Sequence, residues 1–270
     1  MSVAVSRFGQ GIRFVGAKVV DGVGEVGRVT LMYRDVAKSL GRLPDARLIV
    51  EQMDRIGVGS LGLVVVISLF TGAVAAVQAA YQFSSVVPMR YLGSVIMRSV
   101  IIELGPVLTA LVVGGRVGAA IAAELGSMKV TEQIDALRAM GINPIRFLIV
   151  PRVIAATIML PVMTVFSDVI AVFGGFVVAV ASIGVSAGTY VNSLKDFFYL
   201  KDLLSGLIKA VCFGHIIGMM GCFYGFRTEG GAEGVGTATT RAVVASCVLV
   251  LIVDYLLATV LFRVIFSEST

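Results

Sequence analysis

Several charged residues lie within long apolar runs of the sequence, where an ionised side chain is costly unless it is paired or contacts a ligand, and four of them are candidates for a functional site. They are Glu103, Arg116, Lys209 and Asp254. A rise of about 1.5 Å per helical residue places Glu103, Lys209 and Asp254 toward one edge of an apolar layer and Arg116 nearer the other. Equal depth predicts that Lys209 pairs with Asp254 or with Asp168. Such charges either fix the packing of helices or form a polar path for a substrate that carries a charged group.

A short charged segment, residues 129–140, lies between two apolar runs. Its apolar residues recur at the spacing of one helix face: Val130, Ile134 and Leu137. We expect a short amphipathic helix in which Thr131 caps the start and Gly141 ends it. The helix either lies on lipid head groups or docks onto a soluble partner, and its mixture of acidic and basic residues favours docking. The residues expected at such a contact are Glu132, Gln133, Asp135, Leu137 and Arg138.

The composition is that of a membrane protein. Of 270 residues, 57% are hydrophobic and 14% are charged, whereas soluble domains average about 25% charged residues. The mean hydropathy is +0.97. The net charge of +5 is not gathered in one patch, which argues against a nucleic-acid partner. Because no GxxxxGK[ST] loop, Ser–His–Asp set or metal-ligand pattern occurs, we expect no enzyme activity, no cofactor and no metal site in this chain.

Five apolar runs are long enough to cross a bilayer, which takes about 20 residues. Their expected bounds are 58–81, 95–125, 153–185, 203–226 and 242–266. The third run is long but contains no cluster of turn residues, so we expect one helix that is tilted or kinked at Pro161. Polar loops are expected at 186–202 and 227–241. The predicted fold is therefore an all-α integral membrane protein with five transmembrane helices.

The first 56 residues are basic and only moderately apolar, so we expect an N-terminal region (1–56) separate from the membrane domain (57–270). An apolar face after Pro44-Asp45 indicates an amphipathic helix on the membrane surface. That face consists of Leu48, Ile49, Met53 and Ile56. For residues 1–20, a basic tail without fixed structure is a better interpretation than an amphipathic helix.

Small residues recur every three or four positions on two of the predicted spans. They are Gly114, Gly118, Ala122 and Gly126 on the second span and Gly214, Gly218, Gly221 and Gly225 on the fourth. Because such rows let helix backbones approach closely, they predict contacts between helices rather than a pore lining.

The distribution of Lys and Arg predicts the orientation of the chain. Segments 1–56, 126–152 and 227–241 fall on one side of the predicted membrane and hold 15 of these residues, whereas the other side holds 5. The N-terminus and segment 129–140 are therefore expected in the cytoplasm, and the C-terminus on the outer side.

A series of short motifs resembles the MlaE family, the permease subunits of ABC systems that act with MCE proteins on lipids. In order, the motifs are ELGP at 103–106, GGR at 114–116, AAELG at 122–126, TEQIDAL at 131–137, a Gly-Ile-Asn-Pro turn at 141–144, VPR at 150–152 and ATTR at 238–241. The resemblance extends from about residue 43 to the helix that contains Asp254. Residues before about position 41 match no motif of this kind.

The resemblance implies a homodimer in the cell inner membrane, with ABC ATPase subunits in the cytoplasm and an MCE-domain protein on the outer side. It implies an elbow helix before the first span and a coupling helix at 129–140 that contacts the ATPase. The implied substrate is a phospholipid or a related hydrophobic lipid. Glu103, Lys209, Asp254 and Arg116 are then candidates for the substrate path.

An ion-coupled secondary transporter is the alternative, because intramembrane charges also serve in such proteins. Many of these folds consist of two structural repeats. Five spans do not divide evenly, and no internal repeat is visible. Copurification with an ATPase and with lipid separates the two functions.

Overall fold

The computed structural model describes residues 20, 22–39, 41, 45–83 and 88–265, which are helical apart from short turns. The chain divides into two compact units, residues 1–43 and 44–270. The first unit contains a helix over residues 22–39, and the expectation for residues 1–19 lies outside the described residues. The second unit contains the apolar helices.

Within the described residues, five helical runs are long and apolar enough to cross a membrane, which confirms the predicted number. Their bounds are Ala46–Phe83, Met89–Val130, Ile145–Ala181, Leu200–Phe226 and Gly231–Arg263. The first run is a single helix, α2 (Ala46–Phe83). The boundary expected at residue 56 falls inside α2, so the amphipathic face around Met53 continues directly into the first span.

The second run is interrupted by two π-helical turns, which occur frequently at functional sites. It consists of α3 (Leu92–Ser99), a π-turn (Val100–Leu104), α4 (Gly105–Val113), a second π-turn (Gly114–Gly118) and α5 (Ala119–Val130). Glu103 lies in the first π-turn and Arg116 in the second. Each of these two charged residues therefore lies where the regular α-helical hydrogen-bond pattern is altered.

The third and fourth spans are single helical runs, as predicted, although the third begins eight residues and ends four residues before its predicted bounds. The third begins with a π-turn (Ile145–Ile149) and continues as α7 (Val150–Ala181), a single helix with Pro161 in its interior. The fourth is α9 (Leu200–Phe226), which starts three residues before the predicted bound and ends at it.

Two segments predicted as polar loops are largely helical. Residues 186–202 contain α8 (Ala187–Asp196), whose start is capped by Ser186, because the hydroxyl of Ser186 accepts a hydrogen bond from the backbone N–H of Thr189 at 3.1 Å. Residues 227–241 contain the first turns of α10 (Gly231–Ile265). The Gly- and Thr-rich composition of this segment indicated a loop, but the Thr239 and Thr240 hydroxyls donate to the Gly236 carbonyl inside the helix. The predicted last residue of the fifth span, 266, lies outside the described residues.

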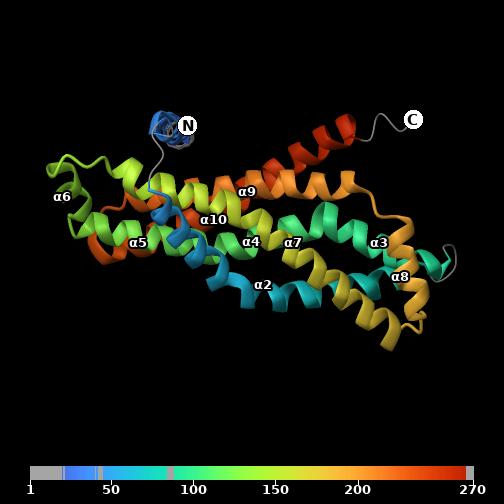
Figure 1. Ribbon diagram of the computed structural model, residues 1–270. Helices are drawn as coiled ribbons and strands as arrows, with labels where there is room; N and C mark the ends of the chain where they lie inside the picture. The colour runs from blue at the N-terminus through green and yellow to red at the C-terminus, as the bar shows by residue number, and fades with distance from the viewer. Residues whose placement is uncertain (1–19, 21, 40, 42–44, 84–87, 266–270) are drawn as a thin grey trace, which may run out of the picture. The chain divides into compact units, whose positions relative to one another are not determined.

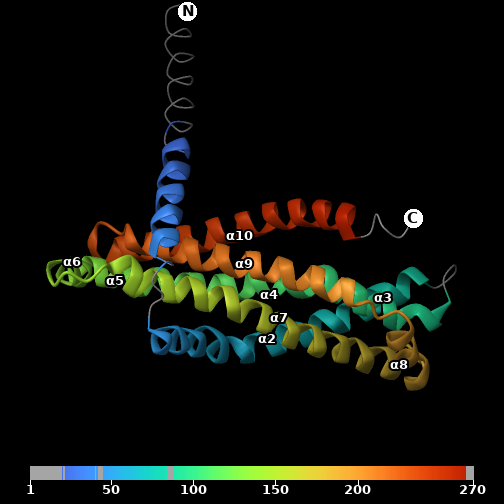
Figure 2. The same ribbon diagram turned by 45° about the horizontal axis from the view of Figure 1, so that its top comes forward.

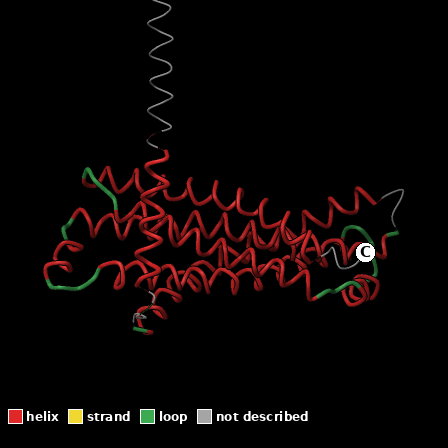
Figure 3. Tube along the Cα trace, turned by 90° about the horizontal axis from the view of Figure 1, so that it is seen from above, coloured by secondary structure: helices red, strands yellow, loops and turns green. Residues whose placement is uncertain are grey.

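The helices of the second unit form a bundle in which α2 lies along α7 and α9 packs against α7, α5 and α10 (Figures 1 and 2). Turns lie at the two ends of the bundle (Figure 3). The short helix α6 (Gln133–Ala139) is at one end, and α8 is at the other with α3 (Figure 1).

The predicted rows of small residues are contacts between helices. On α9, Gly214 faces α7 so closely that a Cβ there would lie 2.4 Å from the Ala156 carbonyl oxygen. Gly225 faces α5, and a Cβ there would lie 2.9 Å from Cα of Ala122. Glycine is required at both positions because another residue would collide with a neighbouring backbone.

Candidate functional site

The helix predicted at 129–140 is shorter than expected. Lys129 and Val130 belong to the end of α5, and a turn at Thr131 and Glu132 separates them from α6. Glu132 has a φ of 60°, a left-handed conformation that is uncommon outside glycine. Thr131 does not cap α6, since its hydroxyl donates to the Ser127 carbonyl at 2.8 Å and so extends the hydrogen bonding of α5.

The end of α6 is the one predicted, at Gly141. This glycine has a φ of 76°, its N–H donates to the Arg138 carbonyl, and the N–H of Ile142 donates to the Leu137 carbonyl. This pair of hydrogen bonds is the Schellman motif, which terminates a helix at a glycine. The chain therefore leaves α6 in a fixed direction toward the Asn143-Pro144 turn.

The apolar face of α6 holds it to the bundle. Ile134 is fully buried and Leu137 is half-buried, whereas Val130 is exposed at the end of α5. The side chains of Glu132 and Gln133 are exposed. Exposed acidic and amide groups on a helix seated by Ile134 can contact a soluble protein.

Asp135 is already paired within this end of the molecule. Its carboxylate lies 2.9 Å from Lys129 Nζ and 2.8 Å from an Nη atom of Arg138. The hydrogen bond from Lys129, the charges of both cations and the bond from Arg138 lower the pKa of Asp135 from its ordinary value. The Arg138 guanidinium also lies 5.6 Å from the ring centroid of Phe226, at the end of α9. The polar side of α6 therefore connects α5 with α9.

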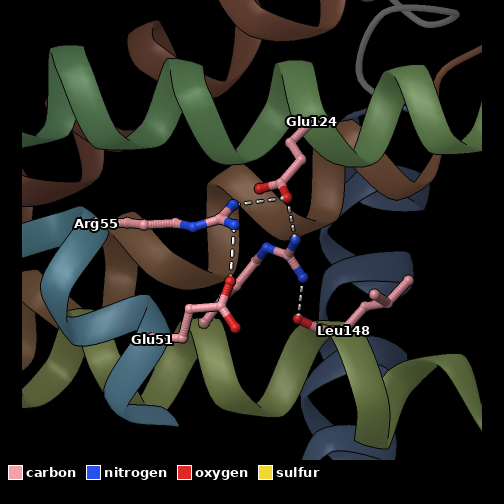
Figure 4. Close-up of polar contacts among 5 residues, drawn as sticks. Glu51, Arg55, Glu124 and Leu148 are labelled. Atoms are coloured by element: carbon pink, nitrogen blue, oxygen red, sulfur yellow. Dashed lines mark hydrogen bonds and ion pairs between the residues drawn. The ribbon is translucent and has the colours of Figure 1, made fainter. Parts of the chain in front are cut away.

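A second ionic network, which the sequence did not reveal, joins three spans near this end (Figure 4). Glu124 of α5 accepts from Arg55 of α2 at 3.3 Å and from Arg152 of α7 at 3.0 Å. Arg55 also pairs with Glu51 at 2.8 Å, and Arg152 donates to the Leu148 carbonyl at 2.7 Å. Glu124 belongs to the AAELG motif and Arg152 to the VPR motif. Their presence in these motifs is the sequence signal that could have pointed to the network.

Three of the predicted path residues form one cluster. The ammonium of Lys209, on α9, lies 2.5 Å from a Glu103 carboxylate oxygen and 2.9 Å from Oδ1 of Asp254, on α10. Of the two partners predicted for Lys209, the structure shows Asp254 and not Asp168, and Glu103 is a second partner that depth alone did not assign. Lys209 is 1% exposed, whereas the Glu103 side chain is 44% exposed. The cluster therefore opens to the surroundings through Glu103.

A further ion pair lies beside this cluster, on the side of α8. Nε of Arg98 donates to Asp202 at 2.8 Å, and the Asp202 side chain is 3% exposed. Asp168, the other candidate partner of Lys209, has no ion-pair partner among the described residues. Its Oδ1 is buried without a hydrogen bond and lies against Gly105.

Arg116 does not join the cluster. It follows Glu103 by 13 residues on the same helical run, which corresponds to about 20 Å. Nη1 of Arg116 donates to the Ser60 hydroxyl at 2.5 Å, between α2 and α5. The four predicted path residues thus separate into a cluster of three and a single guanidinium nearer to α6.

Comparisons with known proteins find relatives over most of the chain. The family model described as "Permease MlaE" matches residues 49–260. A probable ABC transporter permease protein of Rickettsia typhi is 45% identical over 80% of this chain and 84% of its own length. The intermembrane phospholipid transport system permease protein MlaE of Haemophilus influenzae is 34% identical over 93% of this chain and 97% of its own length. The chain therefore belongs to the MlaE permease family.

Proposed function

We propose that this chain is the permease subunit of an ABC transporter that moves phospholipids or related hydrophobic lipids between membranes. The match over residues 49–260 carries this proposal. The relative from Haemophilus influenzae is named for intermembrane phospholipid transport. ATP hydrolysis would take place on a separate ATPase, and the working unit would be a homodimer of this chain in the inner membrane with an MCE-domain protein on the outer side.

The contact with the ATPase is proposed to lie on α6. The buried side chain of Ile134 holds this helix to the bundle, whereas the side chains of Glu132 and Gln133 are exposed and form a polar surface. Of the two carboxylates, Glu132 is the one without an ion-pair partner among the described residues, because Asp135 is held by Lys129 and Arg138. We therefore expect Glu132 to contribute more directly to the contact than Asp135, with Leu137 and Arg138 holding the helix in place.

The lipid path is proposed to pass the Glu103–Lys209–Asp254 cluster. With both carboxylates ionised, this group carries one negative charge in excess of its single ammonium. Glu103 is its exposed member and would be the first to contact the charged part of a lipid head group. Loss of transport in Glu103→Gln, with the protein still folded, would support this role.

Reversal of charge on α6 tests the ATPase contact. Glu132→Lys/Asp135→Lys should leave the protein inserted and folded but reduce copurification with the ATPase, since misplaced charges at an interface weaken association. Asp196→Lys is the matched control, because Asp196 is an exposed carboxylate at the end of α8, at the opposite end of the bundle. Full copurification and normal transport by the double variant would exclude α6 as the coupling helix.

An ion-coupled secondary transporter is the second candidate, and Asp168 is the observation that favours it. This carboxylate is 5% exposed and one of its oxygens has no hydrogen bond, as can occur at a proton-carrying site within a membrane. Transport by reconstituted protein that needs an ion gradient and no ATPase would support this function. Lipid transport that stops without ATP hydrolysis would exclude it.

A further inference from the structure

A groove of about 520 Å³ lies between α2 and α5, toward the end of the bundle that carries α6. Its walls are partly apolar, with Ile56 and Val58 on α2, Val117 in the second π-turn and Ile121 on α5. Its charged lining residues are Asp54, Arg55, Arg116 and Glu124. Because the lining is apolar in part and charged in part, and the groove lies toward one end of the predicted spans, we expect it at the boundary between lipid chains and head groups.

Arg116 supplies an unmatched positive charge to this groove. A guanidinium has five N–H donors, and among the described residues the one bond made by Arg116 goes to the Ser60 hydroxyl. That hydroxyl is neutral and itself donates to the Ile56 carbonyl at 2.7 Å. The remaining donors of an exposed guanidinium are free to bind an anion.

Asp54 supplies an unmatched negative charge. It lines the same groove, is exposed and has no ion-pair partner among the described residues. The other charges here compensate one another, because Arg55 and Arg152 pair with Glu51 and Glu124. Among the described residues that line the groove, Arg116 and Asp54 are therefore a cation and an anion without an ion-pair partner.

We propose that this groove binds the head group of a zwitterionic phospholipid with a primary amine, of the phosphatidylethanolamine type. The phosphate would accept hydrogen bonds from Arg116, whose planar fork suits a phosphate. The ammonium would donate to Asp54. The acyl chains would lie along the apolar walls of α2 and α5. This inference rests on the chain spanning a membrane and not on its role in transport.

The relative depth of the two charges agrees with such a ligand. The Arg116 guanidinium lies against Gly59, where a Cβ would come within 2.7 Å of Nη2. Asp54 precedes Gly59 on α2 by five residues, or about 7 Å of helix rise, and lies nearer the end of the bundle. A phosphate that reaches Arg116 would thus leave the amine of the same head group on the side of Asp54.

Native mass spectrometry of the delipidated full-length protein in detergent tests the proposal. The probes are short-chain phosphatidylethanolamine, phosphatidylcholine and phosphatidylglycerol, with inorganic phosphate as a competitor. We expect one phosphatidylethanolamine per chain, bound more tightly than the other two lipids. Arg116→Gln should weaken this binding at least about tenfold, the loss expected for charge-assisted hydrogen bonds. Asp54→Asn should abolish the preference for phosphatidylethanolamine over phosphatidylglycerol.

Two further variants distinguish a loss of lipid binding from a general loss of folding. Gly59→Ala retains both charges but displaces the guanidinium, so it should weaken lipid binding as Arg116→Gln does. Arg90→Gln, at an exposed arginine beside α3, should change nothing. Unchanged binding in folded Arg116→Gln and Gly59→Ala would overturn the proposal, as would equal affinity for all three lipids. Displacement of the lipid by an equal concentration of inorganic phosphate would instead identify a free-anion site and overturn the assignment to lipid.

Discussion

At the scale of single residues, Lys209 is held between carboxylates from two different helical segments. Its ammonium is buried, and each of Glu103 and Asp254 lies within ion-pairing distance of it. A buried ion pair is costly to break, because the remaining charge stays desolvated. The two partners do not contribute equally, since Glu103 is much more exposed than Asp254.

Removal of the ammonium should be the most damaging change in the cluster. Lys209→Met leaves two carboxylates without their counter-ion, and we expect a cost of about 3–5 kcal/mol. Asp254→Leu alone should cost less, because Glu103 still neutralises Lys209. The double variant Lys209→Met/Asp254→Leu should be more stable than Lys209→Met, and thermal unfolding in detergent measures all three.

The control for this series is Lys201→Met, the same change at an exposed position on the same helix. It should leave the unfolding temperature within a degree or so of the parent, as surface substitutions usually do. Strictly additive losses in the double variant would contradict a coupled cluster.

The ion pairs of Asp135 predict how α6 responds to pH. Because Lys129 and Arg138 lower the pKa of this carboxylate, its contribution to stability is present above the ordinary aspartate pKa of about 3.9 and is lost as the pH falls through the lower, folded value. The carboxyl carbon of Asp135, followed by NMR, should therefore not titrate between about pH 5 and 8. Lys129→Met should raise its midpoint, and an unchanged midpoint would show that the hydrogen bond is not formed.

At the scale of elements, glycines allow the backbones of α2 and α7 to approach each other closely. A Cβ on Gly72 would lie 1.7 Å from the Ala171 carbonyl oxygen, and one on Gly174 would lie 2.3 Å from that of Leu69. These positions tolerate no side chain unless the helices separate. In contrast, a Cβ on Gly62, also in α2, would meet nothing within 4 Å.

Two alanine substitutions in α2 should consequently have opposite effects. Gly72→Ala should destabilise the protein by about 1–3 kcal/mol, because overpacking forces backbone shifts. Gly62→Ala should be neutral or stabilising by up to about 1 kcal/mol, since alanine favours helix. Chemical or thermal unfolding in detergent compares the pair, and equal effects would contradict the backbone contact at Gly72.

The elements differ in how far the sequence predicts them. The five spans were predictable because uninterrupted apolar runs of that length have few alternatives. The start of α10 was not, because its Gly- and Thr-rich sequence has weak helix propensity and tertiary packing decides its structure. The π-turns that contain Glu103 and Arg116 leave no trace in hydrophobic periodicity.

The contacts within the candidate site were also predicted only in part. Equal depth limited the partners of Lys209 to Asp254 or Asp168, because depth depends only on distance along each helix, but it did not decide between them. The network of Arg55, Glu124 and Arg152 was not found, because it depends on how three helices are rotated about their axes. The separation of Arg116 from Glu103 was predicted, because it also depends only on distance along one helical run.

At the scale of the whole molecule, five crossings predict that the two ends of the membrane domain lie on opposite sides of the membrane. The asymmetry of 15 against 5 basic residues predicts that the N-terminal end is cytoplasmic and the C-terminal end is on the outer side. A reporter inserted near Arg138 should be active in the cytoplasm, and one fused at the C-terminus should report the outer compartment. Reporters on the same side would contradict five crossings.

The glycines on two sides of α9 have a mechanical consequence. A helix whose backbone touches α7 at Gly214 and α5 at Gly225 cannot turn or slide without collision, so these three helices would move as one stiff block. A force applied to α6 would reach these three helices at the contact of Arg138 with Phe226. It would reach Lys209, about 25 Å away along α9, because the three helices tilt together and not because side chains rotate one after another. Spin labels on α5 and α9 should keep one separation throughout a transport cycle, and a change in that separation would contradict the stiff block.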